Sequence, residues 1–212
     1  MIAHGDVDPR DRALLEGAEL IVAADGGTLA LEGWGVVPHA IVGDLDSLGV
    51  ERAAEYAAQG VTVLPYSPEK DESDLELAIA YAIEAMADDL VLLGILGGGR
   101  FDHELANTLL MAAEAYRGRE IRAVRGDVTM RALHGGNQLE LAGAPGDLVT
   151  LLAVRGDAEG VRTHQLRYPL AGETLRFGAA RGLSNLVVSA GASVACDRGV
   201  LLVIETRAGG IS

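Results

Sequence analysis

The order of apolar runs along the chain is the feature that most constrains its fold. In residues 1–125, short apolar runs alternate with longer segments of helical periodicity. The apolar runs lie at 1–4, 20–24, 40–42, 61–64, 90–96 and 120–124, and the helical segments at 10–16, 28–33, 50–59, 73–87 and 102–116. This alternation is typical of right-handed crossovers that build a parallel sheet with helices on both faces. Residues 1–125 are therefore predicted to form a Rossmann-like α/β domain.

The helix expected after residue 73 is the most clearly marked of these segments. Ser73 and Glu76 have the spacing of a capping box, in which each side chain binds a free backbone N–H at the helix start. Leu75, Ile79 and Met86 follow at helical intervals and predict one apolar face.

The pattern changes near residue 126. Turn signals rich in glycine, proline, asparagine and aspartate separate apolar runs at 138–142, 148–154, 186–189 and 200–205. Residues 200–204 are all apolar, which indicates a strand in the interior of a sandwich rather than on a one-sided sheet. We therefore expect two domains, an α/β domain at 1–125 and an all-β sandwich at 126–212.

The charge balance excludes several classes of protein. The 212 residues carry 31 acidic and 17 basic side chains, a net charge of −14, and the basic residues are scattered, so no nucleic-acid partner is expected. Lys70 is the only lysine and follows no glycine, which excludes a Walker A loop. Without a signal peptide or an apolar span, a cytoplasmic protein that does not bind membranes is expected. Cys196, the single cysteine, is expected to be a small core or turn residue.

Acidic residues and glycines follow four of the predicted strands. Ligands of open α/β sheets bind at the carboxyl ends of the strands, so these loops are the first candidates for a site. They contain Asp25-Gly26-Gly27, Asp44-Leu45-Asp46, Asp71-Glu72-Ser73-Asp74 and Gly97-Gly98-Gly99-Arg100-Phe101-Asp102. The sequence therefore predicts several carboxylates at one edge of the sheet.

Asp44 and Asp46 form the strongest element. In extended backbone, residues two apart point the same way, and Mg²⁺ prefers one or two carboxylates together with substrate phosphates. The alternative is a turn rich in aspartate, with Ser47 as the cap of the next helix. Asp74 is favoured over Asp71 as a third metal ligand because the helix fixes its position, although acids at a helix start are also favoured by the helix dipole.

The three glycines at 97–99 suit a phosphate group. Glycines let the backbone approach a ligand closely, a helix start offers free N–H groups, and Arg100 can add a bidentate contact. The alternative is a tight turn, with Asp102 as a helix cap and Asn107 on a polar helix face. A Mg²⁺-carboxylate site beside such loops indicates phosphoryl, pyrophosphoryl or nucleotidyl transfer, or phosphate-ester hydrolysis.

These motifs, in this order and approximate spacing, resemble the thiamine pyrophosphokinase family. The similarity covers nearly the whole chain, because Tyr168 with its neighbours and Ser184-Asn185 resemble two short motifs of that family's β-domain. The resemblance implies transfer of the pyrophosphoryl group of ATP to the thiamine hydroxyl, giving thiamine diphosphate and AMP. It also implies a homodimer whose active sites are shared between an α/β domain of one subunit and a β-domain of the other.

The resemblance further assigns roles to individual residues. Asp44, Asp46 and Asp74 would hold Mg²⁺; Asp25, Gly26 and Gly27 would line the cleft; Gly98, Gly99, Arg100, Asp102 and Asn107 would surround the phosphates; Tyr168, Ser184 and Asn185 would bind thiamine. Asp71 and Asp102 are both candidates for a general base. Two other functions stay open: a related pyrophosphokinase with a hydroxymethylpterin acceptor, and a non-catalytic nucleotide-binding module.

Overall fold

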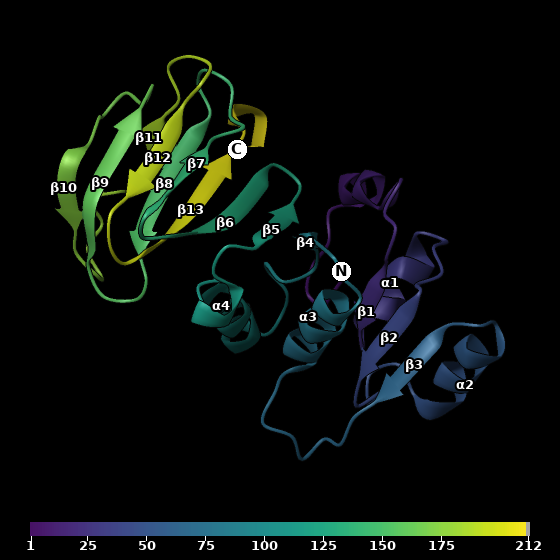
Figure 1. The fold of residues 1–212 in the computed structure, drawn as a ribbon. Coiled ribbons are helices and arrows are strands. Elements are labelled where there is room, and N and C mark those ends of the chain that lie inside the picture. Colours follow the sequence, from purple (N-terminus) through teal and green to yellow (C-terminus); the bar gives the residue numbers. More distant parts are fainter. Residues whose placement is uncertain (211–212) are drawn as a thin grey trace. The chain divides into compact units, whose positions relative to one another are not determined.

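The computed structural model describes residues 1–210 and divides the chain into two compact units (Figure 1). The first contains residues 1–110 and 123–125, and the second contains 111–122 and the chain from 126 onward.

The first unit has a parallel sheet, as predicted. Its elements are η1 (Pro9–Leu15), β1 (Val22–Ala24), α1 (Gly27–Gly33), β2 (Ala40–Gly43), α2 (Val50–Ala58), β3 (Thr62–Pro65), α3 (Asp74–Glu84), β4 (Asp89–Leu92) and α4 (Phe101–Leu110). Strands β1, β2 and β3 are parallel neighbours in that order. Ile2 adds parallel bridges to Ala23 and to Leu93, the residue after β4. The carboxyl ends of all these segments therefore meet at one edge.

Helices cover both faces of this sheet. Ala23 and Ile41 belong to one core cluster with Leu31 of α1 and with residues of α2. Val22 precedes Ala23 and Val42 follows Ile41, so their side chains point to the other face of the sheet. Both are also fully buried. Helix α3 lies along β1 and β2 on that second face (Figure 1).

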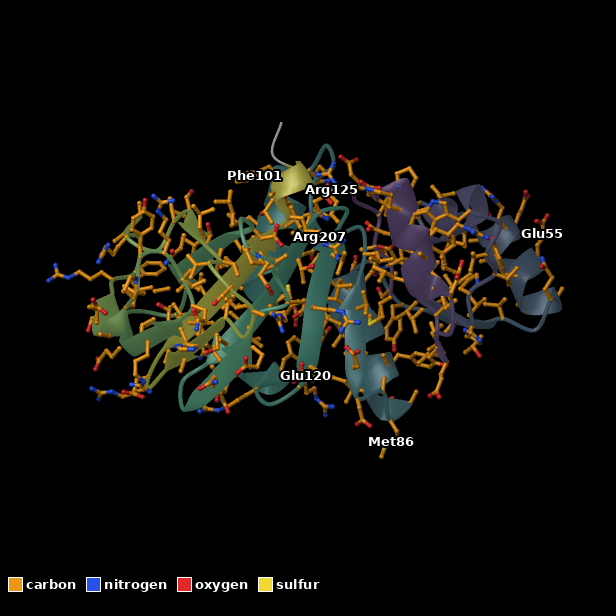
Figure 2. The ribbon with its side chains drawn as sticks, turned by 90° about the horizontal axis from the view of Figure 1, so that it is seen from above. Glu55, Met86, Phe101, Glu120, Arg125 and Arg207 are labelled. Carbon is orange, nitrogen blue, oxygen red and sulfur yellow. The ribbon has the colours of Figure 1, made fainter. Side chains whose placement is uncertain are left out.

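The predicted capping box of α3 is confirmed. The Ser73 hydroxyl accepts the Glu76 N–H at 3.2 Å, and the Glu76 carboxylate accepts the Ser73 N–H at 2.9 Å. The box fixes Asp74 as the first helical residue. The predicted end at residue 87 is wrong, because Met86 has a φ of +64° and an exposed side chain (Figure 2).

The second unit is all-β apart from short 3₁₀ turns, as predicted. Its elements are η2 (Glu114–Tyr116), β5 (Glu120–Arg125, whose last three residues belong to the first unit), β6 (Val128–His134), β7 (Asn137–Glu140), β8 (Leu148–Ala153), β9 (Ala158–His164), β10 (Ala171–Leu175), β11 (Asn185–Leu186), β12 (Ser193–Cys196), β13 (Val200–Thr206) and η3 (Ala208–Gly210). One antiparallel sheet has the order β10-β9-β12-β7. The other places β13 between β8 and β6, with β11 and β5 beyond them. Residues of both sheets form one core cluster, which includes Cys196 as expected.

Several elements differ from the prediction. The helix expected over 102–116 ends at Leu110, and the 3₁₀ turn η2 follows it. Strands β9 and β10 were not predicted. Strand β9 buries only Ala158 and Val161, and β10 buries only Leu175. Few buried residues leave a weak apolar alternation. No helix among residues 1–210 is long and apolar enough to cross a membrane.

Candidate metal and phosphate site

A pocket of about 600 Å³ lies at the carboxyl edge of the parallel sheet in the first unit. The loops that follow Ile2, β1, β2 and β4 contribute to its wall, together with the starts of α3 and α4. The predicted strand-end loops therefore open into one cavity.

Three carboxylates gather in this part of the sheet. Asp25 follows β1, Asp44 follows β2 and Asp74 begins α3, and one oxygen of each lies within 4.8 Å of the others. Asp25 is buried, and the other two are half-buried. Oδ1 of Asp74 is fully buried, and its partner within the described residues is the Lys70 ammonium at 2.9 Å. A cluster of carboxylate oxygens at this spacing is suited to a hard divalent cation.

Gly43 gives these acids the space to approach one another. A Cβ at this position would lie 2.9 Å from both Asp25 Cβ and Asp74 Cγ. Its φ of +149° is also a conformation that residues with side chains rarely adopt. Sequence reasoning missed this role, although a glycine directly before Asp44 at a strand end was a visible signal.

Asp25 has a structural function in addition to its place in the cluster. Its carboxylate accepts the backbone N–H of Ser47 at 3.2 Å and that of Leu48 at 3.4 Å. These contacts fasten the loop after β2 to the end of β1. The sequence predicted Asp25 among the carboxylates at this edge, but Asp25 was not one of the expected metal ligands.

Asp46 lies apart from the group of three. The extended backbone assumed for Asp44-Leu45-Asp46 is wrong, because Leu45 has a φ of +65°. The N–H of Asp46 instead donates to Asp44 Oδ1 at 3.2 Å, and its exposed carboxylate accepts the Ser47 hydroxyl at 3.0 Å. Asp46 lines the pocket. Ser47 does not cap the next helix, because the N-cap of α2 is Gly49.

Lys70 is directed into the group of acids. Its ammonium lies 2.9 Å from Asp74 Oδ1 and 3.6 Å from Asp44 Oδ2. Burial opposes the charge, but the two carboxylates outweigh it and raise the pKa of Lys70. Burial raises the pKa of Asp74, and the negative charges of Asp44 and Asp25 add to this effect, against the opposing ammonium. Asp71, by contrast, is exposed and does not line the pocket.

The three glycines after β4 do different things. Gly97 and Gly98 have φ values of +78° and +101°, so the turn itself requires them. Gly99 has an ordinary φ, and a Cβ there would meet no atom within 4 Å. All three line the pocket. Gly26 lines it too, whereas Gly27 allows α1 to pack on the Ile2 carbonyl.

Helix α4 and Arg100, the residue before it, contribute further polar side chains to the pocket wall. Arg100, His103, Glu104 and Asn107 line the pocket. The Arg100 guanidinium makes two hydrogen bonds to Asp102, at 3.0 and 2.7 Å, and these hold the pKa of Asp102 far below its usual range. Asp102 itself lies outside the pocket wall.

The predicted thiamine residues belong to the second unit. Tyr168 is 57% exposed, and the Asn185 side chain binds its backbone on both sides, accepting its N–H at 2.9 Å and donating to its carbonyl at 2.7 Å. Ser184 is exposed with a φ of +56°, and its N–H donates to the Thr150 hydroxyl. The buried Asn185 therefore holds the segment that carries the Tyr168 ring.

Comparison with known families agrees with this arrangement. Residues 12–123 match the model of the catalytic domain of thiamin pyrophosphokinase. The chain belongs to the thiamin pyrophosphokinase family. Residues 137–201 match that family's vitamin B1 binding domain. The family predicted from the motifs is therefore confirmed.

Family members of known name are similar over most of their length. The chain is 27% identical to thiamine pyrophosphokinase of Bacillus subtilis over 199 residues, which is 88% of this chain and 87% of that protein. The crystal structure of thiamine pyrophosphokinase from Bacillus subtilis superposes on this chain with a TM-score of 0.82 at 24% sequence identity, over 97% of each chain. This similarity supports the fold. That of the Geobacillus thermodenitrificans thiamin pyrophosphokinase has a TM-score of 0.76, 26% identity and the same coverage.

Proposed function

We propose that this chain transfers the pyrophosphoryl group of ATP to the hydroxyl of thiamine, giving thiamine diphosphate and AMP. The observation that carries the proposal is the cluster of Asp25, Asp44 and Asp74 in a pocket beside a glycine turn, within a family whose members bear this name. The vitamin B1 binding model over residues 137–201 favours thiamine over a pterin as acceptor.

The residues present fit a magnesium ion. Asp44 and Asp74 would hold it, with Asp25 or Asp46 as a further oxygen ligand, because Gly43 leaves the carboxylates of Asp25 and Asp74 room to approach. When bound, Mg²⁺ supplies neutralisation of the charge on the ATP phosphates.

The chain's own groups would align ATP for direct transfer. The N–H groups around Gly98 and Gly99, together with Arg100 and Asn107, would contact phosphate oxygens, and Asp25 and Gly26 would shape the adjoining wall. Alignment and charge neutralisation supply most of the catalysis in phosphoryl transfer, so no covalent nucleophile is required.

The general base for the thiamine hydroxyl is proposed to be Asp71 or Asp102. The paired Arg100 holds the pKa of Asp102 far below its usual range, which makes that carboxylate a weak base. Asp71 and Asp102 are both exposed and lie outside the pocket wall, so their position does not distinguish them.

The second unit is proposed to be a β-sandwich that binds thiamine in a homodimer with shared sites. Two antiparallel sheets with one common core support the sandwich, and the exposed Tyr168 ring, with Ser184 and Asn185 beside it, supports a ring-binding surface. Helix α4 exposes Phe101 (Figure 2), Leu105 and Leu109 at helical spacing, an apolar face that supports association with a second copy.

Incubation with ATP, Mg²⁺ and thiamine tests the proposal. Stoichiometric AMP and thiamine diphosphate are expected. ADP as the nucleotide product would contradict pyrophosphoryl transfer, and AMP formed only with hydroxymethylpterin would reassign the acceptor. A folded protein without turnover would support a non-catalytic nucleotide-binding module.

A further inference from the structure

The single lysine of the chain occupies the carboxylates proposed to hold the metal. Lys70 precedes α3 by a few residues, and its ammonium contacts Asp74 Oδ1 at 2.9 Å and lies 3.6 Å from Asp44 Oδ2. The lysine side chain is 13% exposed. The ammonium therefore sits among the oxygens of the cluster and not on the outer surface.

The charges in the cluster explain this position. Three carboxylates whose oxygens lie within 4.8 Å of one another repel strongly, and the ammonium is the cation that reduces this repulsion. It does so incompletely, because its distance of 3.6 Å from Asp44 Oδ2 is longer than a hydrogen bond. A lysine is a compact charge on a flexible stem, so it can leave without moving the backbone that carries the acids.

We propose that Lys70 is an exchangeable counter-ion, which pairs with Asp44 and Asp74 in the metal-free protein and is displaced when a divalent cation binds them. The inference rests on the proposed function, because it takes these acids to be the metal ligands. Displacement leaves the ammonium in a pocket that also contains the glycine turn, where nucleotide phosphates can receive it. The lysine would thus contribute a phosphate contact in place of the absent Walker A lysine.

The exchange predicts that the lysine opposes metal binding when no nucleotide is present. We would measure the affinity for Mn²⁺ alone, from the free Mn²⁺ signal in electron paramagnetic resonance, in the wild type and in Lys70→Met. Loss of a competing partly buried ion pair should tighten Mn²⁺ binding by about 3- to 10-fold. Lys70→Arg keeps the charge and should bind Mn²⁺ like the wild type. Arg52→Met is the matched control, since Arg52 pairs with Glu32 in the same unit, away from the pocket wall.

A second measurement uses the wild-type protein, so that the test of the exchange does not depend on how the variants fold. Because Lys70 is the only lysine, acetylation of one peptide reports its accessibility. Mg²⁺ alone should speed acetylation of Lys70 several-fold relative to NaCl at equal ionic strength. Mg²⁺ with a non-hydrolysable ATP analogue should then slow it.

The outcomes separate this inference from the proposed function. Equal or weaker Mn²⁺ binding by Lys70→Met, or acetylation of Lys70 unchanged by Mg²⁺, would overturn the exchange. If the wild type still formed AMP and thiamine diphosphate, the proposed function would stand. If the exchange were observed but no AMP formed, the proposed function would fail while the counter-ion role remained.

Discussion

Asp25 and Asp44 belong to one group of carboxylates but are held by different contacts. Asp25 is 4% exposed and accepts two backbone N–H groups of the loop after β2. Asp44 is half-buried, faces Lys70 and accepts the N–H of Asp46. Charge is therefore the main contribution of Asp44, whereas Asp25 also supports the loop.

This difference predicts that one substitution lowers mainly the stability of the protein and that a matched substitution lowers mainly its kcat. Asp25→Asn places an amide opposite backbone donors and should lower the free energy of unfolding by about 1–3 kcal/mol. Asp44→Asn should change it by less than about 1 kcal/mol but reduce kcat by on the order of 10². Urea unfolding and steady-state kinetics check both. Equal destabilisation by the two variants would contradict the separation of roles.

Gly43 predicts a second effect on the cluster. A methyl group at this position would collide with Asp25 and Asp74 and add strain at a φ of +149°. Gly43→Ala should lower the free energy of unfolding by about 1–3 kcal/mol and weaken Mn²⁺ binding. Gly35→Ala is the control, because Gly35 also has a positive φ but open space around it. Unaltered Mn²⁺ binding in Gly43→Ala would show that the acids tolerate separation.

The sequence identified the types of residue at the site better than their contacts. The positions of Asp44 and Asp74 could be predicted, because Asp44 follows the apolar strand β2 and Asp74 begins the clearly capped helix α3. The departure of Asp46 could not, since it depends on the left-handed backbone of Leu45, a residue for which that conformation is unusual. The position of Lys70 among the acids also requires the tertiary fold, which brings α3 alongside β2.

At the scale of elements, strong local signals were predicted and weak ones were missed. The capping box of α3 and the apolar strand β13 depend on neighbouring residues in the chain, and both are present. Strand β6 was not predicted, because the alternation of Val128, Met130 and Ala132 with polar residues is short and ends at Leu133. Its stability depends instead on pairing with β13 along its whole length.

The last residue of β6 predicts a dependence of stability on pH. His134 is buried, and neither ring nitrogen has a hydrogen-bond partner in the described part of the chain. Burial lowers its pKa; Glu114, whose carboxylate lies 4.0 Å away, opposes this shift, while Arg117 and Arg155 add to it. The folded protein thus binds the proton less readily than the unfolded chain, and protonation favours unfolding.

The free energy of unfolding should therefore fall as the pH drops through the unfolded histidine value of about 6.5. His134→Phe removes this titration, so the stability difference between wild type and variant should shift in favour of the variant at low pH. Urea unfolding between about pH 5 and pH 8 measures the difference, in which the contributions of the carboxylates cancel. A difference independent of pH would show that His134 titrates alike in both states.

At the scale of the whole molecule, the two units differ in fold and in the residues that they present. The parallel sheet collects acids and glycines at one edge, whereas the second unit exposes Tyr168 on a segment held by Asn185. The two family models match these regions separately. The order of apolar runs was enough to predict this organisation, because it depends on periodicity and not on individual contacts.

A homodimer with shared sites predicts complementation between two inactive variants. Asp44→Asn impairs a site through the first unit, and Tyr168→Ala impairs it through the second, so each pure variant should lose most of its activity. After subunit exchange of equal amounts, half of the dimers are mixed, and each mixed dimer has one of its two sites free of both substitutions. About a quarter of the wild-type activity should then return. Native mass spectrometry of protomers that differ in isotope labelling would verify the exchange. Absence of recovery in verified mixed dimers would place each complete site within a single chain.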